Sequence, residues 1–246
     1  MVVDLEAFCK HFTAELHHRV GELCNLGVDP GDRDRIDKLA IFFALEDCRD
    51  RFARNADGAL PTSRFSMREP KDVTVSALHG ALERTRGGGG RTLLSKAKKN
   101  LMEYLVDFSF SNYSIPQAIG KSKSTAAKQF KLLLAAESEL GSQFDVLRDF
   151  LKLVVVRSPV KVMVYSARTR TNYLTALIDG FERILDTHAK PYLKDESRWL
   201  FVGIPRYAQW IEQWDKPESL PRQVYVVGPN LDKPKLQAKD WWRWRA

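Results

Sequence analysis

The stretch QFKLLLAAESE, residues 129–139, decides the expected architecture of this chain. A short continuous apolar run ends there in two carboxylates, a pattern typical of a buried strand rather than a helix. The segments that follow alternate between helical periodicity and β-rich composition. The expected helices are residues 144–154 and 171–187, and the expected strands are residues 160–166, 198–204 and 223–227. Such alternation predicts an α/β (α+β) protein whose sheet is covered by helices on at least one face.

The part of the chain before this stretch is expected to be mainly helical. Residues 4–24 and 33–54 carry apolar residues at the spacing of one helix face. Residues 73–84 and 92–106 are also predicted as helices. Residues 56–72 are rich in turn-forming and charged residues, so they are predicted as a loop.

A run of glycines, RGGGGR at residues 86–91, interrupts this pattern. It lacks the Lys-Ser/Thr of a phosphate loop and the spaced glycines of a dinucleotide site, and is predicted to be a flexible joint. The expected organisation is a helical N-terminal region at 1–86, a Gly-rich joint at 87–91 and an α/β domain at 92–246 with a Trp/Arg-rich tail.

The chain has 246 residues, with 39 Lys and Arg against 31 Asp and Glu and a formal net charge of +8. Its 44% hydrophobic content is that of a globular protein and excludes a collagen-like or fully disordered chain. Positive charge is concentrated at residues 91–131, which hold eight basic and two acidic residues. Because a basic surface attracts phosphate polyanions, we expect this window to contact nucleic acid. The candidate contacts are Arg91, Lys121, Lys123 and Lys128; a solvated lysine-rich face without function is the alternative.

Three carboxylates are candidates for a metal site. Glu137 and Glu139 are two residues apart on the expected strand, so their side chains should share one side of it. Asp107 lies upstream in LVDFSF, where the pattern changes from helical to β-like. Neighbouring carboxylates repel each other unless a proton or a cation relieves them. Mg²⁺ (or Mn²⁺) suits such a set, and would polarise a phosphodiester and lower the pKa of a bound water.

This order of helix, Asp, apolar strand ending in E-x-E, helix and strand resembles the PD-(D/E)xK nuclease superfamily of restriction-endonuclease-like proteins. The family core is a small mixed sheet flanked by helices, and its signature is an Asp followed by Glu/Asp-x-Lys on the next strand. Asp107 matches the Asp, Glu137 the Glu/Asp, and Glu103 a helical Glu that often precedes them. The resemblance covers about residues 92–205.

The signature departs from the family at two positions. Val106 stands where the proline is expected, and Glu139 stands where the lysine is expected. Lys152, in RDFLKL of the following helix, is the candidate to supply that lysine, with Asp149 orienting it. The resemblance implies a Mg²⁺-dependent nuclease acting on nucleic acid, with duplex DNA expected, in a bacterial restriction or defence setting. It leaves a homodimer open.

Three other interpretations stay open at the level of sequence. The carboxylates of AESELG could be solvated at a strand end, and Asp149 with Lys152 could be an exposed helix pair. The protein could also be a non-catalytic DNA-binding module that uses residues 91–131, or a regulatory interaction protein. Residues 114–132 faintly resemble a helix-turn-helix, although a basic loop beside the active site is the favoured interpretation.

The cysteines, the histidines of the first helix and the C-terminal aromatic residues are expected to have structural roles. Three cysteines are widely spaced without a CxxC pair, which predicts reduced and mostly buried thiols. Three histidines of the first helix lack metal-binding companions and are expected to be exposed. The C-terminal tryptophans and arginines are expected to dock onto the protein body rather than to stack on bases. These sets are Cys9, Cys24 and Cys48; His11, His17 and His18; and Trp241, Trp242, Arg243, Trp244 and Arg245.

The first ten residues, MVVDLEAFCK, lack the basic start and the apolar run of a signal peptide. The apolar stretches at 40–45 and 132–136 are too short to cross a bilayer. We therefore expect a cytoplasmic protein without a membrane partner.

Overall fold

The computed structural model describes eight segments of the chain. They are residues 4–25, 33–52, 62–65, 106–111, 132–168, 171–189, 197–228 and 233–244. The predicted helix at 73–84, the predicted helix at 92–106 except Val106, the glycine joint and most of the basic window lie outside the described residues.

One mixed sheet organises the described chain, and its strands follow one another in chain order. They are β1 (Thr62–Phe65), β2 (Phe108–Ser111), β3 (Leu132–Glu139), β4 (Val160–Ser166), β5 (Arg198–Ile204), β6 (Gln223–Val227) and β7 (Leu236–Ala238). The strands β1, β2 and β3 are antiparallel, β3, β4 and β5 are parallel, and β6 and β7 complete the sheet in antiparallel pairings. The α/β class predicted from the alternating segments is confirmed.

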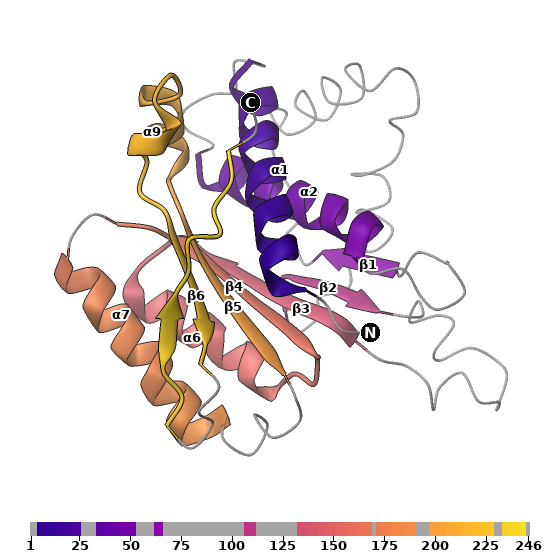
Figure 1. Cartoon of the computed structure of the whole chain (residues 1–246), viewed down its shortest axis with the longest axis vertical. Helices are drawn as coiled ribbons and strands as arrows, with labels where there is room; N and C mark the ends of the chain where they lie inside the picture. Colours follow the sequence, from indigo (N-terminus) through magenta and orange to yellow (C-terminus); the bar gives the residue numbers. More distant parts are fainter. Residues whose placement is uncertain are drawn as a thin grey trace, which may run out of the picture.

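Helices cover both faces of this sheet (Figure 1). The N-terminal helices α1 (Leu5–Asn25) and α2 (Arg33–Phe52) pack on one face. The helices α6 (Gln143–Val155) and α7 (Thr171–Ile184) connect the parallel strands over the other face, and α7 continues as one π-helical turn (Leu185–Ala189). The short helix α9 (Tyr207–Glu212) follows β5, and a 3₁₀ turn (Pro217–Ser219) precedes β6. The structure is therefore a three-layer sandwich with a core on each side of the sheet.

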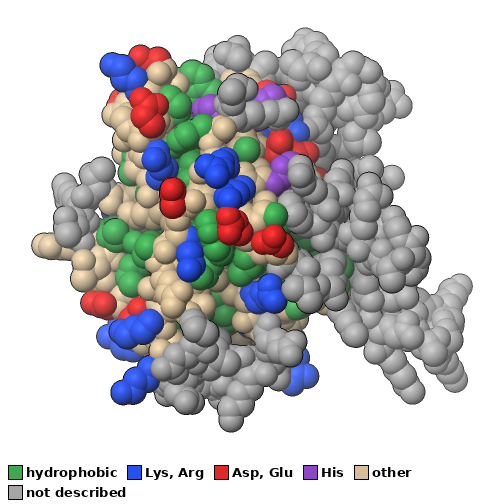
Figure 2. Space-filling view, viewed as in Figure 1, with side chains coloured by type: hydrophobic (Ala, Val, Ile, Leu, Met, Phe, Trp, Pro, Cys, Tyr) green, Lys and Arg blue, Asp and Glu red, His purple; other side chains and the backbone are tan. Residues whose placement is uncertain are grey.

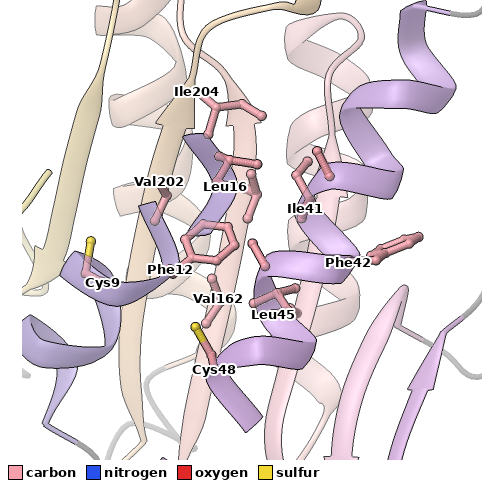
Figure 3. Packing of buried hydrophobic residues seen from close by; sticks show 14 of the residues in the cluster. Cys9, Phe12, Leu16, Ile41, Phe42, Leu45, Cys48, Val162, Val202 and Ile204 are labelled. Carbon is pink, nitrogen blue, oxygen red and sulfur yellow. The ribbon is translucent and has the colours of Figure 1, made fainter. Parts of the chain in front are cut away.

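The first core joins the N-terminal helices to the sheet (Figure 3). Phe12 and Leu16 of α1 and Ile41 of α2 point toward Val162 and Val202 of the sheet. The expected joint at 87–91 lies outside the described residues, but the described elements on its two sides share one sheet and one core. The N-terminal helices therefore form the layer that packs on this face of the sheet.

The cysteine prediction holds for the two described thiols. Cys9 and Cys48 are thiols rather than disulfides, and both are fully buried in this first core (Figure 3). Burial, with a smaller contribution from Glu6, raises the pKa of Cys9 to about 12, so its thiol stays protonated at neutral pH.

The second core is aromatic and lies between the sheet and the helices α6 and α7. Phe150 of α6 packs edge-to-face on Phe181 of α7 and on Trp199 of β5, with ring centroids 4.9 and 5.5 Å apart. Helix α6 buries side chains at helical spacing. Ser142 caps its N-terminus, because the Ser142 hydroxyl accepts the N–H of Asp145. This packing fixes which side of α6 faces β3.

The C-terminal tail docks on α1, as predicted. Trp242 is 5% exposed, and the N–H of Arg243 donates to Thr13 Oγ1 at 3.0 Å. The prediction that the histidines are exposed is wrong for His17, which is buried against the ring of Trp214, 4.5 Å away, and the edge of Trp244, 5.2 Å away. These tryptophans come from the far end of the chain, so the periodicity of α1 alone could not show that His17 is covered.

Three short elements differ from the prediction. The segment 56–72, expected as a loop, contains β1, and neither β7 nor α9 was predicted. The strand β1 forms by pairing with β2, and β7 by pairing with β6, so a partner rather than composition makes each a strand. None of the helices in the described segments combines the length and apolarity needed to span a membrane.

Candidate active site

Asp107 lies directly before β2 and ties it to β3. Its Oδ2 accepts the backbone N–H of Ser138 at 3.0 Å and the Ser138 hydroxyl at 3.2 Å. Phe108 pairs with Ala136 in the antiparallel ladder, so Ser138 lies just beyond the last paired position. The carboxylate thus takes the place of the next backbone acceptor, which holds Asp107 beside Glu137.

Glu137 is the most unusual side chain of the sheet. It is 0% exposed, and neither carboxylate oxygen accepts a hydrogen bond from the described residues. Burial above all, followed by the negative charge of Asp107, raises the pKa of Glu137 to about 9, although Lys152 opposes the shift. Asp107 is the available acceptor for the Glu137 proton. Without a bound cation, Glu137 is therefore mainly protonated at neutral pH.

Lys152 reaches this carboxylate pair from α6. Its Nζ lies 3.0 Å from Asp149 Oδ1 and 3.6 Å from Glu137 Oε2. Partial burial lowers the pKa of Lys152, but the hydrogen bond to Asp149 and the charges of Glu137, Asp149 and Asp107 outweigh this and raise it. Lys152 therefore carries a positive charge at neutral pH and can stabilise an anion rather than act as a base. Asp149 is itself buried, so the pair is not an exposed helix pair.

A second ammonium group approaches from the opposite layer. Lys38 of α2 places its Nζ 3.9 Å from Asp107 Oδ2. No sequence pattern points to Lys38, because only the packing of α2 on the sheet brings it to the start of β2. The site thus receives cations from both helical layers.

Glu139 does not join Asp107 and Glu137. Its Oε1 accepts the N–H of Gly141 at 2.6 Å, because the chain turns directly after β3. Among the described residues, no group of three or more His, Cys, Asp or Glu side chains is arranged to hold a metal ion. The expected set of three carboxylates is thus reduced to the pair Asp107 and Glu137.

This pair still fits a divalent cation of the magnesium type. Mg²⁺ is bound in proteins through one or two carboxylates, with waters and substrate phosphates as its other ligands. The two oxygens of Glu137 lie beside Asp107 and accept no hydrogen bond from the described residues, which favours a cation there, since a buried carboxylate without donors is costly.

The other predicted site residues lie outside the described part of the chain. These are Glu103 and the proposed nucleic-acid contacts Arg91, Lys121, Lys123 and Lys128. On the described face in Figure 2, Lys and Arg side chains are scattered among acidic ones and do not form one basic patch. The predicted basic surface therefore remains a prediction.

Comparison of the chain with models of protein families, with curated proteins and with solved structures finds no match. The function therefore has to be argued from the geometry of Asp107, Glu137 and Lys152.

Proposed function

We propose that this protein is a Mg²⁺- or Mn²⁺-dependent nuclease that hydrolyses phosphodiester bonds, with duplex DNA as the preferred substrate and a restriction-endonuclease-like core. One observation carries the proposal. An Asp at the start of one strand, a Glu on the adjacent strand and a Lys from the next helix meet in one site.

The topology around these residues supports the same proposal. The strands β2 and β3 form an antiparallel pair, and α6 leads from β3 to the parallel strand β4. The result is a mixed sheet with helices on both faces and the acidic residues on its two neighbouring strands, as the family resemblance implies.

In this proposal Asp107 and Glu137 hold the metal ion. When bound, Mg²⁺ supplies positive charge that stabilises the transition state of phosphoryl transfer. Glu137 would then be ionised, because a cation replaces its proton as the group that relieves the buried carboxyl. Ser138 keeps Asp107 in place through its backbone N–H and its hydroxyl.

Lys152 takes the role of the lysine that the signature lacks at position 139. It carries a charge, it is held by Asp149, and its side chain is 36% exposed, so a phosphate can reach it. Placed near the reacting phosphate, an ammonium group stabilises the negative charge that develops on the phosphate oxygens.

The test is cleavage of a panel of single- and double-stranded DNA and RNA, with Mg²⁺ or Mn²⁺ and with EDTA. We expect metal-dependent cutting that Glu137→Gln reduces by at least about 100-fold while nucleic-acid binding persists. Glu212→Gln, on the exposed side of α9, makes the same chemical change outside the site and should cut like the wild type. Binding without cutting by the wild type, with either metal, would instead favour a non-catalytic binding module.

A further inference from the structure

Two arginines meet at the turn that follows β3. Arg168, two residues beyond β4, donates from Nη2 to the carbonyl of Gly141 at 2.7 Å. Arg206, two residues beyond β5, donates from Nη2 to the carbonyl of Leu140 and from Nε to Ser166 Oγ at 3.2 Å. Successive carbonyls of one turn thus hold two guanidinium groups at the carboxyl ends of the parallel strands.

Neither guanidinium has an acidic partner in the part of the chain that the structure describes. Arg168 and Arg206 are both partly buried, and neither forms an ion pair with a carboxylate of the described residues. Glu139 is the carboxylate of this edge, and the N–H of Gly141 already engages it. Two neighbouring cations that are partly removed from water are unfavourable unless an anion joins them. The arrangement therefore has an excess of positive charge and of N–H donors.

Tyr173 of α7 completes the arrangement. The guanidinium of Arg168 lies 4.6 Å from the centroid of its ring, which fixes the orientation of that arginine. The Tyr173 hydroxyl is buried and has no hydrogen-bond partner among the described residues. Burial raises the pKa of Tyr173, with a smaller contribution from Glu139, and Arg168 and Arg206 oppose the shift, so the hydroxyl is within electrostatic reach of two cations and one carboxylate. A buried donor without an acceptor is a second sign that an anionic group is missing here.

We propose that Arg168 and Arg206, supported by Tyr173, bind a phosphate group. A guanidinium matches the oxygens of a phosphate with paired N–H donors, which favours this anion over a monatomic one. Ligands of open α/β sheets commonly bind outside the carboxyl ends of parallel strands, where these residues lie.

The position relative to the candidate catalytic site suggests the source of the phosphate. Leu140, whose carbonyl binds Arg206, is three residues beyond Glu137, which corresponds to at most about 10 Å along the chain. A nucleic-acid strand that places one phosphate at Asp107 and Glu137 can therefore place another at Arg168 and Arg206. This source rests on the proposed nuclease function, whereas a free phosphate would need only the arginines.

The decisive measurement is the affinity for a fluorescent duplex DNA in EDTA, where no cutting occurs, over a range of salt concentrations. We expect the double variant Arg168→Gln/Arg206→Gln to bind about tenfold more weakly and to lower the slope of log K against log salt by about one to two. Arg183→Gln removes the same charge from an exposed position of α7, and should leave both quantities unchanged.

A parallel measurement separates the two sources. Inorganic phosphate should raise the melting temperature of the wild type more than that of the double variant. If only this difference appears, the site binds free phosphate; if DNA affinity also falls, it binds the strand. A double variant that matches Arg183→Gln in both measurements would overturn the proposal.

Two further controls keep the result interpretable. If the glutamine variants melt below the assay temperature, Arg168→Lys and Arg206→Lys keep the charge, and should preserve the salt slope while weakening the affinity. Loss of DNA binding in the double variant of a protein that never cuts nucleic acid would leave the phosphate site standing and remove the nuclease function.

Discussion

Arg19 and Glu137 are both buried charged residues, yet their surroundings differ completely. Arg19, between α1 and α2, donates from Nε and Nη2 to Asp47 at 3.0 and 2.7 Å, and from Nη1 to Glu22 at 2.7 Å. Glu137 receives no hydrogen bond from the described residues, and its one cation is 3.6 Å away. The donors of the first cluster are all matched by acceptors, whereas in the second both oxygens of Glu137 lack a donor among the described residues.

The difference separates a structural ion pair from a candidate functional site. Arg19 has an oxygen for each of its main donors, so its charge contributes to holding α1 against α2. The burial of the Glu137 carboxyl costs free energy, and the folding of the chain alone does not explain why this cost is accepted. The same burial makes Glu137 a strong ligand once a cation binds. Substitutions in the two clusters should therefore affect different properties of the protein.

The largest effect is expected from Lys152→Ala. Under the proposed mechanism it should reduce cutting by about 100- to 1,000-fold, because its charge acts on the transition state. DNA affinity should change little. The melting temperature should fall, because the buried Asp149 loses its closest cation, whereas Glu137 keeps its proton, so cutting is compared at a temperature at which both proteins are folded. Lys235→Ala, which removes a lysine from the surface pair with Glu182, is the matched control. If Lys152→Ala cuts at the wild-type rate, Lys152 has no role in cutting and is only the ion-pair partner of Asp149.

The second largest effect is expected in the pH dependence of the free energy of unfolding of the metal-free protein. Glu137 has a pKa of about 9 when folded and about 4.5 when unfolded, so between these values the folded state binds a proton that the unfolded state has released. Stability must then fall as pH rises, by about 2–3 kcal/mol between pH 6 and pH 8. Urea unfolding in EDTA measures it, and Glu137→Gln should remove this component. Parallel pH profiles of the two proteins would show that Glu137 is ionised in the folded state.

The third effect tests the other cluster. Arg19→Gln should lower the free energy of unfolding by about 1–2 kcal/mol, because charged hydrogen bonds to Asp47 and Glu22 are lost. It should leave cutting by the remaining folded protein unchanged. Lys10→Gln removes a cation from an exposed pair on the same helix, and should cost less than about 0.5 kcal/mol. Reduced cutting by stably folded Arg19→Gln would contradict the separation of the two clusters.

Long periodic elements could be predicted from the sequence, and short ones could not. The helices α1, α2, α6 and α7 and the strands β3, β4, β5 and β6 have their own apolar patterns, so local residues determine them. The strand β1 has four residues and β7 has three, and each exists through its pairing with a neighbouring strand. His17 shows the same limit for side chains, because tryptophans nearly 200 residues away bury it.

Some residues of the candidate site could likewise be predicted from the sequence, and others could not. Asp107, Glu137 and Lys152 could be grouped because adjacent strands and the following helix constrain where they lie. Lys38 could not be found, since its place depends on how α2 packs against the sheet. Arg168 and Arg206 follow separate strands, and only the parallel order of β3, β4 and β5 brings them to one turn.

Substitution of Glu139 is expected to have the smallest effect on cutting. It is also the sharpest test of the comparison between Arg19 and Glu137, because the sequence predicted Glu139 as a third metal ligand. In the structure it resembles Arg19, because its carboxylate is already engaged by its own turn. Glu139→Gln keeps an oxygen for the Gly141 N–H, so cutting and metal affinity should stay within about twofold of the wild type, whereas losing a metal ligand costs far more.

Gly141 supplies the matched test of that contact. A Cβ at position 141 would lie 2.7 Å from Glu139 Oε1, so Gly141→Ala should displace the carboxylate from the turn. If Glu139 only caps the turn, Gly141→Ala should lower the melting temperature slightly and leave the Mg²⁺ dependence of cutting unchanged. A Glu139→Gln protein that needs much more Mg²⁺ would place this residue back in the metal site, and the pair Asp107 and Glu137 would again become a set of three.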